Sequence, residues 1–225
     1  MSLLKSIRSS LSMPHPAGYP FLLLTGIPTL IGYLTPWRFT RFLGKLSGML
    51  FGFCWFFFRN PTRVSPSQDN IIVAPADGTI AAIEQVIPPT GLGMSETPVW
   101  RVSIFLSVLN VHVQRIPTNG KVTGRVYIEG KFFNASLDKT SEHNERNAIC
   151  MTLPNGKKLI VVQIAGLIAR RIVCDAVVEK NYNLGDIYGL IRFGSRVDLY
   201  LPEGCIPSVK VGQTMIGGET IVAQI

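Results

Sequence analysis

Residues 190–202 read LIRFGSRVDLYLP, and this run, which is rich in apolar and β-branched residues, is typical of one continuous β-strand. Only the dipeptide Gly194-Ser195 interrupts it. Glycine inside a strand weakens the strand and permits a strained backbone or the close approach of another group. Most chains use this dipeptide in turns, so its position within a strand is the informative feature.

The peptide bond between Gly194 and Ser195 has a physical route to self-cleavage. The Ser195 hydroxyl can attack the Gly194 carbonyl if the peptide is distorted and a base removes the hydroxyl proton. The resulting ester can eliminate to dehydroalanine, which hydrolyses to a ketone and ammonia. The product is a pyruvoyl group at a new N-terminus. The dipeptide alone is a weak signal, so its surroundings must decide.

Short runs rich in β-branched residues also fill most of the chain from Asn70 onward, separated by Gly, Asn and Pro turns. Asn155-Gly156, between two of these runs, predicts a hairpin with a type I′ turn. Residues 130–147 lack strand character, and we expect a loop with a short helix there. The predicted fold class is therefore mainly β (α+β), as a β barrel or sandwich. The predicted strands are residues 71–75, 78–87, 99–107, 120–130, 148–154, 158–166, 171–178, 190–202 and 219–225.

The C-terminal part of the chain adds a finer pattern. GDIYGLIRFGSRVDLYLPEG (185–204) and VKVGQTMIGGETIVAQI (209–225) repeat short strands with a glycine at each corner. This pattern favours a lipoyl-like hammerhead, although glycine usually serves ordinary turns.

Net positive charge is concentrated at the N-terminal end. The first 68 residues hold seven Lys or Arg and no acidic residue, whereas the remaining 157 hold fifteen basic and fourteen acidic residues. A nucleic-acid surface would spread its basic residues over a polar face. Here they flank strongly apolar runs, and basic residues in that setting are attracted to anionic lipid headgroups. The pattern therefore favours a phospholipid membrane as partner and argues against nucleic acid.

Residues 1–63 are predicted to form an apolar helical membrane arm. The first apolar run (20–34) is interrupted by prolines, and the second (46–58) is too short to cross a bilayer alone at about 1.5 Å per residue. Residues 36–45 read as an amphipathic basic connector, with Trp37 as an interface aromatic. We expect a hairpin dipped into one leaflet, with both ends on the same side. A transit peptide or a secretory signal is the alternative.

His112 and Asp77 are the other candidate functional residues. His112 lies in the apolar run VLNVHVQRIP (108–117), where a histidine is more often a satisfied core residue than a catalyst. Asp77 lies in APADGTI, and an Asp-Gly pair is common in turns. The cysteines are widely spaced, which indicates small buried apolar residues rather than a metal site or a disulfide framework. They are Cys54, Cys150, Cys174 and Cys205.

An ordered set of segments is more specific than any of these residues alone. The segments are FFRNPTR (57–63), PADG (75–78), FLSVLNVHVQRIPTNG (105–120), GKFFNA (130–135), NER (144–146) and RFGSRVDLYLP (192–202). In this set the chain resembles the phosphatidylserine decarboxylase proenzymes of the short bacterial type. The resemblance covers roughly residues 50–225.

The resemblance implies cleavage between Gly194 and Ser195. A β fragment (1–194) and an α fragment (195–225) would result, with Ser195 converted to a covalent pyruvoyl group. The domain over residues 64–225 would then turn phosphatidylserine into phosphatidylethanolamine and CO₂ through a Schiff base with that group. The two fragments would stay together at the cell membrane, peripheral or hairpin-inserted and facing the cytoplasm, and a homo-oligomer is compatible with the family.

The resemblance also assigns roles to three further residues. Asp77 matches the aspartate of the family's self-cleavage triad, and His112 is the candidate for proton delivery, an ordinary role for imidazole. Longer relatives carry a second histidine three positions after the first, where this chain has Arg115. Arginine cannot act as a base at ordinary pH. Either His112 covers the role of base, or cleavage depends more on strain and Asp77.

Two other functions fit parts of the sequence. A membrane-tethered hammerhead that binds proteins without catalysis would explain the arm and the glycine corners, but not the ordered segments. A membrane-anchored serine hydrolase would use Ser195 with His112, and a fluorophosphonate probe would label its serine.

Overall fold

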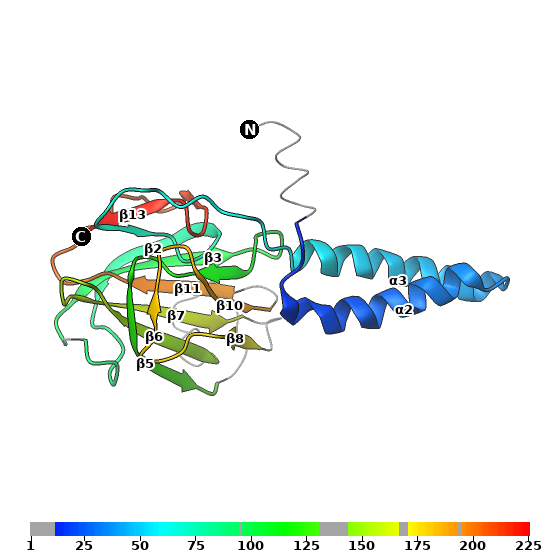
Figure 1. Ribbon diagram of the computed structural model, residues 1–225, viewed down its shortest axis with the longest axis horizontal. Coiled ribbons are helices and arrows are strands. Elements are labelled where there is room, and N and C mark those ends of the chain that lie inside the picture. Colours follow the sequence, from blue (N-terminus) through cyan, green and yellow to red (C-terminus); the bar gives the residue numbers. More distant parts are fainter. Residues whose placement is uncertain (1–11, 95, 131–143, 167–170, 193–194) are drawn as a thin grey trace. The chain divides into compact units, whose positions relative to one another are not determined.

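The computed structural model describes residues 12–94, 96–130, 144–166, 171–192 and 195–225. The chain forms two compact units, Met1–Thr62 and Arg63–Ile225. The described part of the first is helical, and the second is built mainly from β-strands (Figure 1).

The first unit is an antiparallel helical hairpin. A single 3₁₀ turn, η1 (Pro16–Gly18), leads into α2 (Tyr19–Leu34), and residues 35–37 connect α2 to α3 (Arg38–Phe57). Pro20 lies in the first turn of α2, where a missing N–H is tolerated, so Pro28 is the proline inside the helix. The prediction that residues 36–45 connect the two apolar runs is wrong for most of that range. α3 already begins at Arg38, and the arginines, leucine and lysine that follow favour a helix.

The two helices approach each other through small residues. A Cβ atom added at Gly32 would lie 2.4 Å from the Cα atom of Gly44, so the two backbones are in contact there. Ser47 of α3 donates a hydrogen bond of 2.7 Å to the carbonyl of Thr25 in α2. Small-residue contacts and polar bonds of this kind are typical of helix pairs in membranes.

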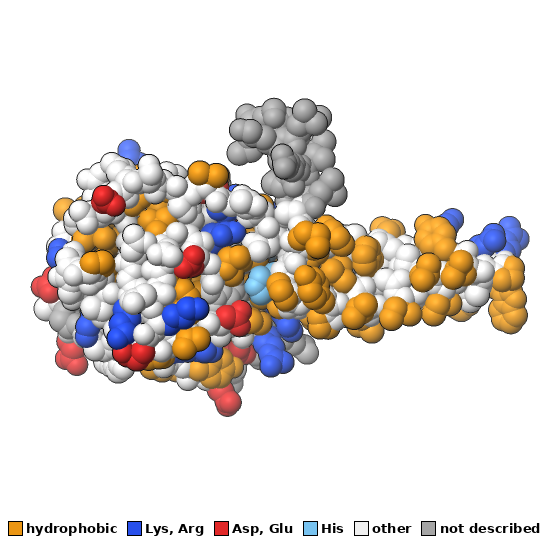
Figure 2. Space-filling model, in the orientation of Figure 1, with side chains coloured by type: hydrophobic (Ala, Val, Ile, Leu, Met, Phe, Trp, Pro, Cys, Tyr) orange, Lys and Arg blue, Asp and Glu red, His pale blue; other side chains and the backbone are white. Residues whose placement is uncertain are grey.

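Large apolar side chains consequently point away from the hairpin, and they cover much of its visible surface (Figure 2). The segment Pro16–Leu34 is long and apolar enough to cross a membrane. The exposed large side chains of the two helices and their connection are Tyr19, Leu23, Leu24, Ile27, Leu30, Ile31, Tyr33, Leu34, Trp37, Phe39, Phe42, Leu43, Leu46, Met49, Leu50 and Phe53.

The described residues of the second unit form three antiparallel sheets. The largest has eight strands in the order β12-β2-β3-β11-β7-β6-β5-β9, a second has the order β4-β10-β8, and β1 pairs with β13. Register shifts in β2 and β5 interrupt regular pairing, and the large sheet is curled (Figure 1). The strands are β1 (Ile71–Val73), β2 (Gly78–Val86), β3 (Val99–Leu106), β4 (Val113–Arg115), β5 (Gly120–Ile128), β6 (Arg146–Thr152), β7 (Lys158–Ala165), β8 (Ile172–Cys174), β9 (Asn181–Tyr182), β10 (Ile187–Ile191), β11 (Ser195–Tyr200), β12 (Thr214–Met215) and β13 (Ile221–Gln224).

Strand β11 lies between β3 and β7, and all six of its residues are buried. Successive side chains of a strand point to opposite faces. Val197 and Leu199 pack into the larger apolar core with residues of the two smaller sheets, whereas Tyr200 packs into a second cluster on the other side. We call these the inner and outer faces of the large sheet.

Residues 190–202 do not form one strand, so that prediction is wrong. β10 ends at Ile191 in the three-stranded sheet, and β11 begins at Ser195 in the eight-stranded sheet. The chain passes from one sheet to the other between these residues. Ser195 is therefore the first residue of a strand, and Gly194 itself is outside the described residues.

The hairpin between β6 and β7 is confirmed, but its predicted turn type is wrong. A type I′ turn needs positive φ at both central residues. Gly156 has φ of 81°, whereas Asn155 is not among the described non-glycine residues with positive φ. Gly156 N–H donates to the Leu153 carbonyl at 2.9 Å, which closes a turn around Pro154 and Asn155. Proline presets the negative φ of the first central position, so a type I turn followed by a left-handed glycine forms instead.

Candidate active site

Ser195 is the first residue of β11 and is completely buried. It pairs with Leu106 at the end of β3 and with Ala165 at the end of β7. By alternation with Val197, its side chain faces the inner core. Its hydroxyl has no hydrogen-bond partner among the described residues. A buried hydroxyl without a partner is unfavourable, which is a reason to look for chemistry at this atom.

His112 lies one residue before β4 and is also completely buried. Its Nδ1 atom is 3.0 Å from the carbonyl oxygen of Asn110. A backbone carbonyl can only accept a hydrogen bond, so Nδ1 carries the proton and Nε2 is the basic nitrogen of the neutral ring. This fixed tautomer suits a group that takes up and returns a proton at Nε2.

Asp77 is held by two strong contacts. Its Oδ2 atom lies 2.6 Å from Nη2 of Arg63, and its Oδ1 atom accepts a hydrogen bond of 2.8 Å from the Gly217 N–H. The next residue, Gly78, begins β2, and a Cβ atom there would lie 2.3 Å from the Phe105 carbonyl oxygen. The Asp-Gly pair is thus more than a turn. It ties the start of β2 to β3 and to the C-terminal segment.

Arg115 lies near the same carboxylate. Its Nη1 atom donates a hydrogen bond of 3.0 Å to the Gly185 carbonyl. Burial lowers the pKa of its guanidinium, as does the nearby Arg63, and the charges of Asp77 and Glu219 oppose this. Two arginines and two carboxylates therefore form a balanced charge cluster around Asp77. Arg115 is a cation in that cluster, and it does not replace a histidine as a base.

The sheet register brings Ser195 and Asp77 to one end of the domain. Ser195 pairs with Leu106, and the preceding residue of β3, Phe105, pairs with Thr79 near the start of β2. Asp77 therefore lies at the same end of the large sheet as Ser195, with β3 between them. His112 follows β3 by six residues. Sequence order alone does not show this proximity.

The sequence interpretation missed a chain of polar side chains on the inner face. Asn147, Gln163 and Gln114, on β6, β7 and β4, are almost completely buried and are joined by hydrogen bonds between their amides. A polar residue inside an otherwise apolar strand is the signal that could have identified them, as in KLIVVQIAG (158–166).

A buried ion pair on the outer face was missed as well. Arg196 and Asp198 are both about 2% exposed and form two hydrogen bonds, of 2.6 Å and 2.9 Å. Arg196 also donates a hydrogen bond of 2.9 Å to the hydroxyl of Ser103 on β3. Arg196 directly follows Ser195 and Asp198 comes three residues after it, but the side chains of both point to the opposite face of the sheet.

The cysteines take no part in this constellation. Cys54, Cys150 and Cys205 are buried, as predicted, whereas Cys174 is partly exposed. Burial raises the pKa of the Cys150 thiol, which keeps it protonated and unreactive.

A protein-family model and similar curated proteins point to the same family. Residues 50–223 match the phosphatidylserine decarboxylase family. The chain is 56% identical to the phosphatidylserine decarboxylase proenzyme of Gluconacetobacter diazotrophicus and 53% identical to that of Gluconobacter oxydans, over the full length of both proteins in each case. It is 49% identical to the proenzyme of Saccharopolyspora erythraea, over 97% of this chain and 91% of the relative.

Proposed function

The chain belongs to the phosphatidylserine decarboxylase family, and from this membership we propose that it makes its own catalytic group from Ser195. The enzyme decarboxylates phosphatidylserine to phosphatidylethanolamine and CO₂. The observation that carries the proposal is the buried hydroxyl of Ser195 at the start of a central strand, for which the described residues provide no hydrogen-bond partner. Fully paired strands on both sides hold that hydroxyl in place.

Self-cleavage begins with attack of the Ser195 Oγ atom on the carbonyl carbon of Gly194. The bond between this carbon and the Ser195 nitrogen breaks, and the nitrogen takes up a proton, so an ester replaces the peptide bond. Elimination then releases the carboxylate of Gly194 and leaves a carbon–carbon double bond at residue 195. Addition of water and loss of ammonia give the pyruvoyl group. The β fragment ends at Gly194, and the α fragment begins at residue 195.

His112 is the proposed base and acid. Its Nδ1–H is fixed by the Asn110 carbonyl, so Nε2 can accept the proton from the Ser195 hydroxyl during cleavage. In the mature enzyme the same nitrogen would deliver a proton to the carbon that has lost CO₂. The Asp77 carboxylate already binds Arg63 and Gly217, which supports a positioning role in self-cleavage. It would hold the β fragment against the α fragment at this end of the sheet.

The site fits a pyruvoyl group at residue 195. Conversion removes the hydroxyl that has no partner among the described residues, so no buried hydrogen bond is lost when the serine is consumed. Once formed, the group supplies an electrophilic carbonyl that captures the substrate amine and serves as an electron sink.

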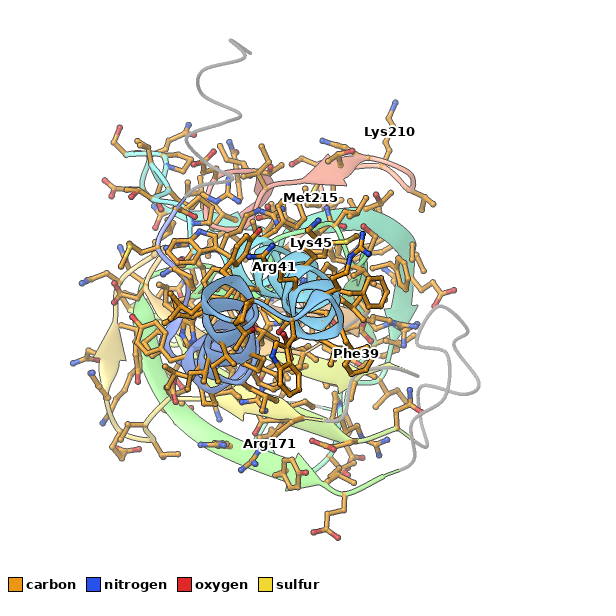
Figure 3. All side chains as sticks on the ribbon, turned by 90° about the vertical axis from the view of Figure 1, so that its right-hand side faces the viewer. Phe39, Arg41, Lys45, Arg171, Lys210 and Met215 are labelled. Carbon is orange, nitrogen blue, oxygen red and sulfur yellow. The ribbon has the colours of Figure 1, made fainter. Side chains whose placement is uncertain are left out.

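We assign residues 64–225 to this decarboxylase domain and residues 1–63 to the membrane. The bilayer is the proposed environment of the exposed apolar side chains of α2 and α3, because water would solvate them poorly. Arg41 and Lys45 lie on one side of the hairpin and Phe39 on another (Figure 3), which suits contact with headgroups and acyl chains respectively. The expected location is the cytoplasmic face of the cell membrane. Release of the intact protein from membranes by alkaline carbonate would contradict insertion of the arm.

We also propose the lipoyl-like hammerhead for the C-terminal part. Left-handed glycines at Gly212 and Gly218 support it, since they turn the chain beside the short strands β12 and β13.

Intact-mass analysis of the purified protein tests the proposal. We expect two fragments that end and begin at residues 194 and 195. The shorter one should be lighter by one ammonia than its encoded sequence, blocked to Edman sequencing and modified by hydroxylamine. A fully active preparation made only of the uncut chain would refute the proposal.

A further inference from the structure

Three buried amides form a continuous chain of hydrogen bonds across the inner face of the large sheet. Nε of Arg125 donates to Oδ1 of Asn147 at 3.0 Å, and Nδ2 of Asn147 donates to Oε1 of Gln163 at 2.8 Å. Nε2 of Gln163 donates to Oε1 of Gln114 and, at 3.3 Å, to the Val173 carbonyl. The chain thus runs from a surface arginine to the interior end at Gln114.

The arginine fixes the orientation of every amide in this chain. A guanidinium only donates hydrogen bonds, so Asn147 must present its oxygen to Arg125 and its nitrogen to the next residue. The amide of Gln163 is oriented in the same way by Asn147, and the amide of Gln114 by Gln163. The last amide therefore turns its NH₂ group away from the chain. This nitrogen is buried and has no hydrogen-bond partner among the described residues.

The end of the chain lies beside the reacting residue. Gln163 pairs with Val197, and two positions further along Ala165 pairs with Ser195, so Gln163 and Ser195 are neighbours on the inner face. Gln114 reaches the same face from β4, two residues after His112. The NH₂ group, which no described residue accepts, therefore belongs to the space between the two sheets that Ser195 also faces.

A pair of N–H donors in a buried site is a binding site for an anionic oxygen. On the proposed function, the amine of the serine headgroup reacts at residue 195. The carboxylate is attached to the same carbon as that amine, whereas the phosphate lies farther along the headgroup. The carboxylate is therefore the anionic group that comes nearest to Gln114.

The side-chain amide of Gln114 is uncharged, and this suits a carboxylate that must be lost as CO₂. Loss of CO₂ removes the negative charge of the carboxylate, and an arginine partner would stabilise that charge strongly and oppose its loss. An amide holds and orients the carboxylate with weaker bonds. We propose that Gln114 is the residue that recognises the headgroup carboxylate, and that Arg125, Asn147 and Gln163 position it. The inference rests on the proposed function of Ser195.

The test compares two soluble headgroups that differ only in the carboxylate. Processed enzyme is first reduced with borohydride, so that ligands bind without reacting, and calorimetry then measures the Kd of glycerophosphoserine and of glycerophosphoethanolamine. In Gln114→Leu we expect the affinity for glycerophosphoserine to fall by about 10-fold to 100-fold, because a hydrogen bond to a charged group is lost. The affinity for glycerophosphoethanolamine should stay the same. Gln114→Glu should weaken glycerophosphoserine further by charge repulsion.

Two variants at the outer end separate recognition from folding. Arg125 is exposed, so the Arg125→Met variant should fold and be cleaved. Because it removes the hydrogen bond that orients Asn147, the amides can rotate, and the preference for glycerophosphoserine over glycerophosphoethanolamine should fall several-fold. Arg125→Lys, which still donates, should restore most of it. Gln85→Leu, an exposed position of the same sheet, is the matched control and should change neither Kd.

Intact mass must show complete cleavage in every variant that enters the comparison. The inference is overturned if cleaved Gln114→Leu binds both ligands as the wild type does, or weakens both equally. It is also overturned if Gln114→Leu is not cleaved and Arg125→Met keeps the full preference. Failure of the proposed function looks different, because the wild-type chain itself would then lack the cut and the pyruvoyl group.

Discussion

Two buried polar networks lie on opposite faces of the large sheet beside Ser195, and they differ in whether they are closed. On the outer face, Arg196 and Asp198 satisfy each other through two hydrogen bonds, with Ser103 as an additional acceptor. On the inner face, the amide chain ends at Gln114 with donors that no described residue accepts. A closed network stabilises a local conformation. The network on the inner face still has N–H groups that can donate hydrogen bonds to a ligand. For this reason only the inner face is assigned to the substrate.

Replacement of Ser195 should have the largest effect, because it abolishes the reaction and leaves both polar networks in place. Ser195→Ala should give an uncut chain with no decarboxylase activity, because no oxygen remains to attack Gly194. The variant should still fold and unfold cooperatively in urea, since the removed hydroxyl has no partner in the described structure. Gel analysis, an activity assay and urea unfolding check this. Ser208→Ala, which changes a distant serine, should still be cut.

Removal of one partner of the ion pair between Arg196 and Asp198 should have the next largest effect. Asp198→Leu leaves the buried guanidinium of Arg196 without its carboxylate, and we expect a loss of roughly 3–5 kcal/mol in the free energy of unfolding. The double variant Arg196→Met/Asp198→Leu removes both charges and should recover most of that loss. Urea unfolding in the uncut Ser195→Ala background measures both. If the double variant is as unstable as the single one, the pair is not a closed network.

The smallest effect is expected at Tyr188, a buried hydroxyl that also has no partner among the described residues. Burial raises its pKa well above the usual value near 10, so the folded state holds the proton more tightly than the unfolded state does. Stability is therefore complete below about pH 10 and falls as the pH rises above it, when only the unfolded state ionises.

Tyr188→Phe should reduce this alkaline decline and change the free energy of unfolding at pH 7 by no more than about 1 kcal/mol. Urea unfolding between pH 8 and pH 11 measures it. Some decline should remain, because burial also raises the pKa of Tyr200. An unchanged slope in the variant would show that Tyr188 ionises equally in both states.

Most strands and the helical hairpin could be predicted from periodicity and turn residues, because these are local signals. The boundary between β10 and β11 could not, since residues 190–202 read as one run typical of a strand and only their assignment to different sheets divides them. The short strands β4, β9 and β12 were missed for a similar reason. Two or three residues are too few for a period, and pairing partners far away in the sequence create these strands.

The candidate site was predictable only in part. Ser195, His112 and Asp77 were identified from the ordered segments shared with the family. The contacts of Asp77 with Arg63 and Gly217 could not be foreseen, because the latter is 140 residues away. The amide chain escaped notice because its members come from three different strands, and a single glutamine in an apolar run does not show what it faces.

The position of β11 has a consequence for the life of the mature enzyme. The proposed cleavage at residue 195 would leave a 31-residue chain that contributes β11, with a neighbour on each side, to the middle of the large sheet. The same short chain supplies the edge strand β12, and the longer chain supplies the other six strands of that sheet. The shorter chain could not leave without breaking the pairing of β11 with β3 and β7, of β12 with β2 and of β13 with β1. Separation of the two chains and unfolding would therefore be the same event. The two chains should therefore remain the pair that was synthesised together, without exchange between molecules, until the enzyme is degraded.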